Sequence, residues 1–132
     1  MFADGFATSQ VLRDSDPQAF ATLARTLIPC RFFNRECDIR IHKPVITLDH
    51  AGAIQEIRFN AHLVDLIDLP PETVGAWYRA YRTFMRLPRD PAFQLSFRMA
   101  PSAMKAFDNG AYCAAAKPST PPPATATCMA VM

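Results

Sequence analysis

The chain of 132 residues is half hydrophobic, which suits one globular domain with a packed core. Its 14 lysine and arginine residues are interspersed among 12 aspartate and glutamate residues, and a net charge of only +2 gives no reason to expect nucleic acid as a partner. No run approaches the roughly 20 apolar residues of a membrane span, and the first residues lack the basic start and apolar core of a signal peptide. The sequence therefore predicts a cytoplasmic protein that does not enter a membrane.

The first half of the chain predicts a short amphipathic helix followed by strands. Asp16 stands before Pro17 as an N-cap stands before a first-turn proline, and Phe20, Leu23 and Leu27 follow at helical spacing. Strand-like segments come next, over residues 30–34, 38–42, 45–48 and 54–60, with a hairpin turn at residues 49–52.

The second half predicts a longer helix over residues 71–87, ended by Pro88, and two strand-like runs over residues 93–98 and 104–107. Helices beside short strands predict the α+β class, with helices packed on an antiparallel sheet. So few strands leave unprotected edges, which is how part of a larger sheet would look.

The composition changes abruptly near Gly110. Residues 111–132 carry no charge except Lys117 and show no periodic apolar face. Such a segment cannot bury enough apolar surface to order itself, so residues 111–132 are predicted to be a disordered tail. On composition alone, a natural linker or tail explains it.

Side chains that could bind a metal are present but wrongly spaced. An iron site with two histidines and one carboxylate presents one histidine and the acid from a single strand end as H-x-D or H-x-E. None of His42, His50 and His62 has an acid two residues further on, so surface or turn positions are the better interpretation. The four cysteines, too, lack the close C-x-x-C spacing of zinc or redox sites, and they are interpreted as reduced thiols (Cys30, Cys37, Cys113 and Cys128).

Aromatic residues gather on the predicted helix over residues 71–87. Trp77, Tyr78, Tyr81 and Phe84 could form a cation cage, because ring faces attract quaternary ammonium groups. Their helical spacing on an apolar face favours a core role. No catalytic or metal-binding residue is assigned from these motifs.

Several segments, in one collinear order, resemble parts of the γ-butyrobetaine and trimethyllysine dioxygenases. They are DGF (4–6), KPVITLD (43–49), IRFN (57–60), LPPETVGAWYRAYRTF (69–84) and DPAFQLSFRMAPSAMKAFDN (90–109). The resemblance implies a double-stranded β-helix, a jelly-roll-like fold of which this chain would be a C-terminal part. It also implies Fe(II) held by an H-x-D pair and a later histidine, and 2-oxoglutarate held by an arginine. The implied reaction hydroxylates a small trimethylammonium substrate in carnitine synthesis.

The same resemblance implies that residues 1–110 are an incomplete catalytic domain. The H-x-D pair belongs before the DGF segment, and the third ligand should follow Phe107-Asp108-Asn109, where this chain reads GAYCAAAKPSTPP. The position of Pro101-Ser102-Ala103 is usually Pro-Gly-Asp in the family, and losing the glycine strains that turn. Asn60 aligns with an asparagine that hydrogen-bonds the substrate carboxylate, although a strand-end or turn role for Asn60 is an equal alternative.

A shifted reading frame is a second interpretation of residues 111–132. Regrouping the degenerate codons of residues 114–132 by one base can yield a continuation of the family, including Arg-His-Leu, which suggests a base lost near Gly110. The triplet at the ligand position, built from the codons of Cys113 and Ala114, would then encode Arg or Cys. On either interpretation we expect an inactive oxygenase fragment that binds neither Fe(II) nor 2-oxoglutarate. The alternative is a non-catalytic interaction module that pairs through its strand edges, with a homodimer as one outcome.

Overall fold

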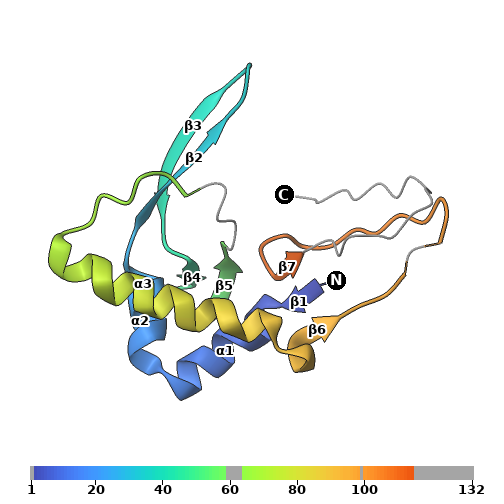
Figure 1. Ribbon diagram of the computed structural model, residues 1–132, viewed down its shortest axis with the longest axis horizontal. Coiled ribbons are helices and arrows are strands. Elements are labelled where there is room, and N and C mark those ends of the chain that lie inside the picture. Colours follow the sequence, from blue (N-terminus) through green and yellow to red (C-terminus); the bar gives the residue numbers. More distant parts are fainter. Residues whose placement is uncertain (1, 59–63, 99, 115–132) are drawn as a thin grey trace.

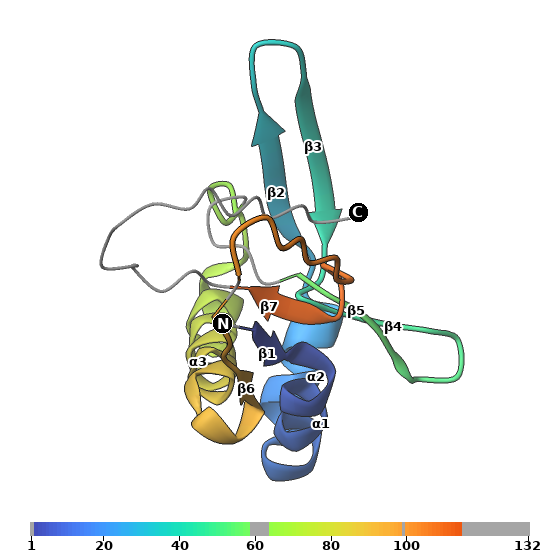
Figure 2. The same ribbon diagram turned by 90° about the vertical axis from the view of Figure 1, so that its right-hand side faces the viewer.

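The structure is a computed structural model that describes residues 2–58, 64–98 and 100–114, with side chains described up to residue 111. Within these ranges, helices α1, α2 and α3 pack against one another, and small antiparallel sheets lie beside and above them (Figure 1). The hairpin of β2 and β3 projects away from the rest of the chain in both views (Figures 1 and 2). We call this hairpin, residues 28–43, the ribbon, and the remainder of the described chain the body.

Capped helices open the chain. Asp4 is the N-cap of α1 (Gly5–Ser15), where its Oδ1 accepts a hydrogen bond of 2.9 Å from the Ala7 N–H. Asp16 caps α2 (Pro17–Arg25) in the same way, through a 2.9 Å bond from the Ala19 N–H. The predicted helix start at Asp16-Pro17 is confirmed.

The helix α3 (Pro71–Arg86) runs across α2, and a 3-10 turn at Leu87–Arg89 follows it. Its buried face contributes Trp77, Ala80 and Phe84 to the core, as the apolar spacing predicted. The other core residues come from α1, α2, the strands and the bend before β4, among them Leu12, Phe20, Leu23, Ile28, Val45, Ile46 and Ile57.

Two hairpins follow the pattern of the sequence. The ribbon pairs β2 (Ile28–Phe33) with β3 (Asp38–Lys43), and the second hairpin pairs β4 (Ile46–Leu48) with β5 (Ile54–Ile57). Between β4 and β5, the Asp49 carboxylate accepts from the Ala51 and Ala53 N–H groups at 2.9 and 2.8 Å. Gly52 takes a φ of +81°, which glycine adopts without steric cost. The predicted turn at residues 49–52 is therefore confirmed.

A third sheet joins distant parts of the chain in the order β6-β1-β7. Its strands are β1 (Phe2–Asp4), β6 (Gln94–Leu95) and β7 (Tyr112–Ala114). The predicted strand over 93–98 is thus reduced to two residues. The strand predicted over 104–107 is wrong, because only Lys105 takes part in a β-bridge there. Order extends into the predicted tail, since β7 pairs with β1; residues 115–132 lie outside the described residues.

Hydrogen bonds from the body hold the turn that leads into β7. The Ile57 N–H donates to the Gly110 carbonyl at 2.8 Å, and the Gly5 N–H donates to the Ala111 carbonyl at 3.0 Å. These bonds join β5 and the start of α1 to a segment that lies much later in the chain. The fold is a mixture of helices and small antiparallel sheets, and the strands described do not close into a barrel.

Candidate functional site

A pocket of about 590 Å³ lies beside the sheet β6-β1-β7. Residues from β1, from β6 with its flanking turns, and from the segment before β7 line it. Most of the lining residues are apolar, and four of them are phenylalanines: Phe2, Phe93, Phe97 and Phe107. Concave, mostly apolar pockets with few polar groups are the usual form of a small-molecule site, so this pocket is the candidate site.

The rings in this pocket contact one another. Phe2 and Phe97 are stacked with centroids 5.9 Å apart, and Phe107 meets Phe2 edge to face at 4.7 Å. The Lys105 ammonium lies 4.1 Å from the centroid of Phe2 and 5.7 Å from that of Phe97. These distances are typical of cation–π contacts, which gives the pocket a positive charge on an aromatic wall.

A carboxylate, that of Asp4, also lines the pocket. Its Oδ1 is engaged with the Ala7 N–H as the N-cap of α1, which gives the carboxylate a structural role. The pocket as described can hold an apolar group and attract an anion through Lys105. It presents neither a nucleophile with an adjacent base nor an acid–base pair.

The described residues do not fit the iron site that the sequence resemblance implies. No group of three or more His, Cys, Asp or Glu side chains is close enough to hold a metal ion within the described part of the chain. His42 is exposed on β3 and His50 is exposed in the β4–β5 turn, which agrees with the surface interpretation, whereas His62 lies outside the described residues.

The predicted substrate residue Asn60 also lies outside the described residues, so its role stays a prediction. The position expected for the third metal ligand falls in β7, where Cys113 pairs with Ala3 and Ala114 pairs with Phe2. Ala114 has no donor atom. The backbone at this position therefore runs beside β1, the strand whose Phe2 and Asp4 line the aromatic pocket.

The aromatic residues of α3 pack against one another and do not form an open cage for a cation. Trp77 is 1% exposed and stacks on Tyr81 with centroids 4.9 Å apart and an interplanar angle of 13°, while Tyr78 meets it edge on at 5.1 Å. Rings in direct contact leave no room between them for a quaternary ammonium group. A second pocket, of about 480 Å³, lies beside these rings and is lined also by residues 64–67.

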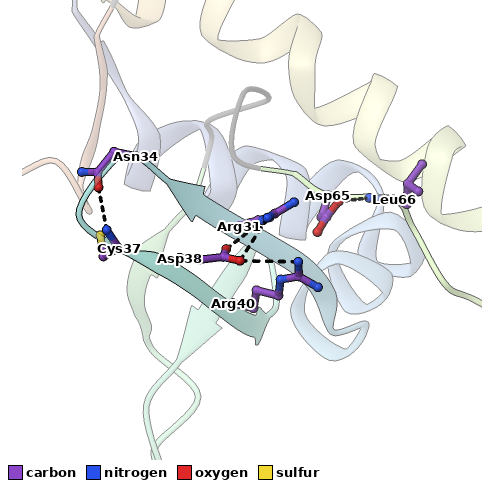
Figure 3. A network of polar contacts seen from close by, with 7 residues as sticks. All are labelled: Arg31, Asn34, Cys37, Asp38, Arg40, Asp65 and Leu66. Atoms are coloured by element: carbon purple, nitrogen blue, oxygen red, sulfur yellow. Dashed lines mark hydrogen bonds and ion pairs between the residues drawn. The ribbon is translucent and has the colours of Figure 1, made fainter.

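A charged cluster occupies one face of the ribbon (Figure 3). The Arg31 side chain donates two hydrogen bonds to the Asp38 carboxylate, at 2.8 and 3.0 Å, and Arg40 approaches the same carboxylate at 3.5 Å. The hydrogen bond from Arg31 is the main reason why the pKa of Asp38 is lowered, and it raises the pKa of Arg31 in turn. Paired, exposed charges of this kind are structural, not catalytic.

Of the four cysteines, the structure describes the side chains of Cys30 and Cys37, and neither has the features of a catalytic thiol. Burial raises the pKa of Cys30, and the nearby positive charge of Arg58 opposes that shift only in part. A raised pKa keeps Cys30 a neutral thiol, which is a poor nucleophile and metal ligand. Cys37 is also a free thiol, so the prediction of reduced cysteines is confirmed for these two residues.

The pocket with Lys105 has no clear signature in the sequence. The alternation of Phe2 and Asp4 was too short to identify a strand, and Lys105 fell in a predicted strand that does not form. The only available signal was the density of phenylalanine between residues 93 and 107. In addition, no described helix has the length and apolar character needed to cross a membrane.

Comparisons with known proteins agree on one family. A model of the taurine catabolism dioxygenase TauD, TfdA family matches residues 1–124. γ-Butyrobetaine dioxygenase of Pseudomonas sp. (strain AK-1) is 34% identical over 108 residues, which are 82% of this chain and 28% of that protein. The human γ-butyrobetaine dioxygenase is 34% identical over 111 residues, or 80% of this chain and 28% of that protein.

Trimethyllysine dioxygenase of Meyerozyma guilliermondii is 28% identical over 111 residues, again 80% of this chain and 28% of the relative. The chain thus spans 28% of the length of these curated relatives. Which part of the relatives it corresponds to stays a prediction. The family match runs past Gly110 to residue 124 and lends no support to a shifted reading frame there. Because the family model matches nearly the whole sequence, the chain belongs to the TauD/TfdA family of dioxygenases.

Proposed function

We propose that this chain is a segment of a γ-butyrobetaine dioxygenase-type oxygenase. In its intact form such an enzyme would use Fe(II) and 2-oxoglutarate to hydroxylate a small trimethylammonium compound in carnitine biosynthesis. The observation that supports this proposal is 34% identity to two γ-butyrobetaine dioxygenases over about four fifths of the chain. Trimethyllysine dioxygenase is less similar, at 28% identity, so γ-butyrobetaine is the preferred substrate.

The fold that goes with this proposal is part of a double-stranded β-helix. The sheet β6-β1-β7 and the hairpin β4–β5 would be portions of its strands, and residues 1–110 would be the incomplete catalytic domain. Residues 111–132 would be the tail, of which 112–114 form β7. The expected setting is the cytoplasm, without nucleic acid or membrane as a partner.

We propose further that this chain alone does not catalyse the reaction. The support is its donor set: none of its histidines begins an H-x-D or H-x-E pair, and the expected third-ligand position holds Cys113 and Ala114. An oxygenase needs a correctly ligated metal to generate its oxidant. We therefore derive no catalytic step and expect neither Fe(II) nor 2-oxoglutarate to be bound by this chain.

A turnover assay tests the proposal. The purified chain is incubated with Fe(II), ascorbate, 2-oxoglutarate and either γ-butyrobetaine or trimethyllysine, and succinate and hydroxylated product are measured by mass spectrometry. The Pseudomonas γ-butyrobetaine dioxygenase serves as the positive control. We expect no product above the level without protein. Substrate-dependent succinate that a chelator abolishes would contradict the proposed inactivity.

Asn60 is the proposed contact for the substrate carboxylate, because an amide NH₂ donates to carboxylate oxygens. Calorimetric titration of γ-butyrobetaine into the chain is expected to show weak binding that Asn60→Ala removes. Asn109→Ala, which alters an exposed asparagine of the same type, is the matched control. Equal affinities for the wild type and Asn60→Ala would contradict this role and leave a structural one.

A non-catalytic interaction module is the second candidate function. The observation that favours it is the projecting ribbon, in which every residue of β3 is exposed. The two candidates differ in what they require of the chain: a fragment of an enzyme binds the substrate, whereas an interaction module binds a protein through the ribbon.

A further inference from the structure

The pocket beside the sheet β6-β1-β7 has both buried and exposed apolar walls. Phe2, on the central strand β1 (Figure 2), is only 6% exposed. Leu95 and Phe97 also line the pocket, yet they remain 63% and 50% exposed. Exposed apolar side chains around a cavity of about 590 Å³ are typical of a small-molecule site. The pocket therefore offers surface that an apolar ligand would remove from water.

Lys105 gives this pocket a cation that no acidic side chain neutralises within the described part of the chain. Its ammonium lies over the rings of Phe2 and Phe97, at 4.1 and 5.7 Å from their centroids. The ion pairs among the described side chains join arginines, not Lys105, to aspartate or glutamate. Ring faces attract a cation without cancelling its charge, so the ammonium can still attract an anion.

Asp4 is the acid that lines the same pocket, and its charge is compensated elsewhere. Its Oδ1 accepts a hydrogen bond from the Ala7 N–H at 2.9 Å, at the N-terminus of the 11-residue helix α1. A helix N-terminus carries a partial positive charge, which stabilises a carboxylate placed there. The repulsion that Asp4 exerts on a bound anion is therefore reduced, and Lys105 decides the sign of the ligand.

The position of Lys105 also argues against a quaternary ammonium ligand in this pocket. Such a cation binds over a ring face, and the Lys105 ammonium already takes that place on Phe2. A second positive charge would be repelled there. Phe2 also makes both a stacked contact, with Phe97, and an edge-on contact, with Phe107. An alkyl chain, which needs no particular ring geometry, should fit beside these rings better than a further flat ring.

We propose that this pocket binds a medium-chain fatty carboxylate. The carboxylate pairs with the Lys105 ammonium, and the alkyl chain packs along Phe2, Leu95 and Phe97. Binding neutralises the free cation and covers the exposed apolar walls in one step. The ligand is bound and not converted, because the pocket presents neither a nucleophile with an adjacent base nor an acid–base pair. The site is independent of the proposed oxygenase function, since it uses neither Asn60 nor a metal.

Calorimetric titration of the purified full chain with octanoate, octan-1-ol and octylammonium tests the sign of the ligand. The three probes share one alkyl chain and differ in the charge of the head group. Octanoate is expected to bind with one molecule per chain, and octan-1-ol on the order of tenfold more weakly, because it lacks the charge-assisted hydrogen bond. Octylammonium is expected not to bind. A chain that does not bind octanoate, or that binds any other probe as tightly, overturns the proposal.

Lys105→Met tests the cation, because methionine keeps an unbranched apolar side chain and removes the charge. The variant is expected to bind octanoate on the order of tenfold more weakly and octan-1-ol unchanged. Lys43→Met is the matched control, since Lys43 is exposed on β3 and does not line the pocket. Equal losses of octanoate affinity in the two variants, or no loss in Lys105→Met, overturn the proposal.

Phe97→Ala tests the apolar wall and is expected to weaken octanoate and octan-1-ol alike. Phe33→Ala is its matched control, because Phe33 is 69% exposed on the ribbon and does not line the pocket. Shortening the ligand to hexanoate should weaken binding by about fourfold for each methylene removed. Equal effects of the two substitutions, or an affinity independent of chain length, overturn the placement of the alkyl chain in this pocket.

Folding of each variant is checked by far-ultraviolet circular dichroism and by the fluorescence of Trp77, which is buried in the body. If Lys105→Met fails to fold, the salt dependence of the wild-type chain carries the same test. Sodium chloride should weaken the binding of octanoate, since it screens the ion pair, and leave that of octan-1-ol no weaker. An octanoate affinity that salt does not lower overturns the pairing with Lys105.

Competition separates this site from that of the proposed oxygenase. 2-Oxoglutarate has no apolar body, and γ-butyrobetaine carries a quaternary ammonium group that Lys105 repels. Neither is expected to displace octanoate, and displacement by either overturns the proposal. Failure of the proposed oxygenase function leaves this result untouched, because octanoate binding is measured without iron and turnover is measured without octanoate.

Discussion

The body and the ribbon are stabilised in different ways. In the body, helices α1, α2 and α3 and the hairpin β4–β5 bury a shared apolar cluster. The ribbon instead relies on the ladder between β2 and β3, a capped turn and one charged cluster, while its Phe32, Ile39 and Ile41 side chains stay exposed. Burial dominates folding free energy, so a single chain should hold the body firmly and the ribbon loosely.

The largest expected effect compares two phenylalanines. Phe84 is fully buried in the body, whereas Phe33 is 69% exposed on the ribbon. Phe84→Ala leaves a cavity and should lower the free energy of unfolding by about 3–5 kcal/mol. Phe33→Ala loses little more than its contact with Arg31 and should cost at most about 1 kcal/mol. Urea unfolding followed by Trp77 fluorescence measures both, and similar losses would contradict the contrast between the regions.

Gly5 and Gly75 differ in how much space surrounds them, and substitutions at Gly5 test how closely α1 packs against the segment before β7. A Cβ on Gly5 would lie 2.8 Å from the Ala111 carbonyl oxygen and 3.0 Å from Ile57 Cδ1. Gly5→Ala should therefore destabilise the protein by about 1–3 kcal/mol, as overpacking does. Gly75→Ala, whose Cβ would meet only the flexible end of Arg79 at 3.4 Å, should stabilise α3 by up to about 1 kcal/mol. If both variants moved the denaturation midpoint in the same direction, α1 would not be closely packed against Ala111.

Local signals in the sequence predicted helices α2 and α3, the strands of the two hairpins and the turn between β4 and β5. Asp16-Pro17 marks the start of α2, and Asp49 with Gly52 marks the turn between β4 and β5. The sheet β6-β1-β7 could not be predicted in this way, because β1 and β7 stand about a hundred residues apart and are each only three residues long. Short strands take their stability from the partner strand, which no local pattern reveals.

The segment between β6 and β7 shows where local patterns mislead. Residues 104–107 read as a strand, yet the chain turns just before them, and Ser102 takes a φ of +65°. That is the left-handed region which favours glycine, so the predicted strain at Pro101-Ser102-Ala103 is confirmed. Most of the candidate site could not be predicted from the sequence. Its residues Phe2 and Lys105 are far apart in the chain and come into contact only in the folded structure.

Capping residues provide a smaller test of the same contrast. Asp16→Ala removes the acceptor for the Ala19 N–H in the body and should cost about 1 kcal/mol in the free energy of unfolding. Asn34→Ala removes the acceptor for the Glu36 and Cys37 N–H groups at the tip of the ribbon. Its effect should be confined to faster amide exchange of ribbon residues, measured by NMR, while the unfolding midpoint stays nearly unchanged. A global loss in Asn34→Ala would show that the ribbon unfolds together with the body.

The smallest expected effect is the pH dependence of the ribbon. The pKa of Asp38 is lowered, chiefly by its hydrogen bond from Arg31, so the carboxylate favours the folded ribbon above the ordinary aspartate pKa of about 3.9. That contribution is lost as the pH falls through the lower, folded-state pKa. An NMR titration of the Asp38 carboxyl should therefore have a midpoint below the ordinary one, with ribbon amides exchanging faster once it is protonated. Arg31→Met should move the midpoint upward, whereas Arg35→Met, which removes a positive charge from the tip, should move it less. Equal shifts in the two variants would mean that overall charge, rather than the paired geometry of Arg31 and Asp38, stabilises this face of the ribbon.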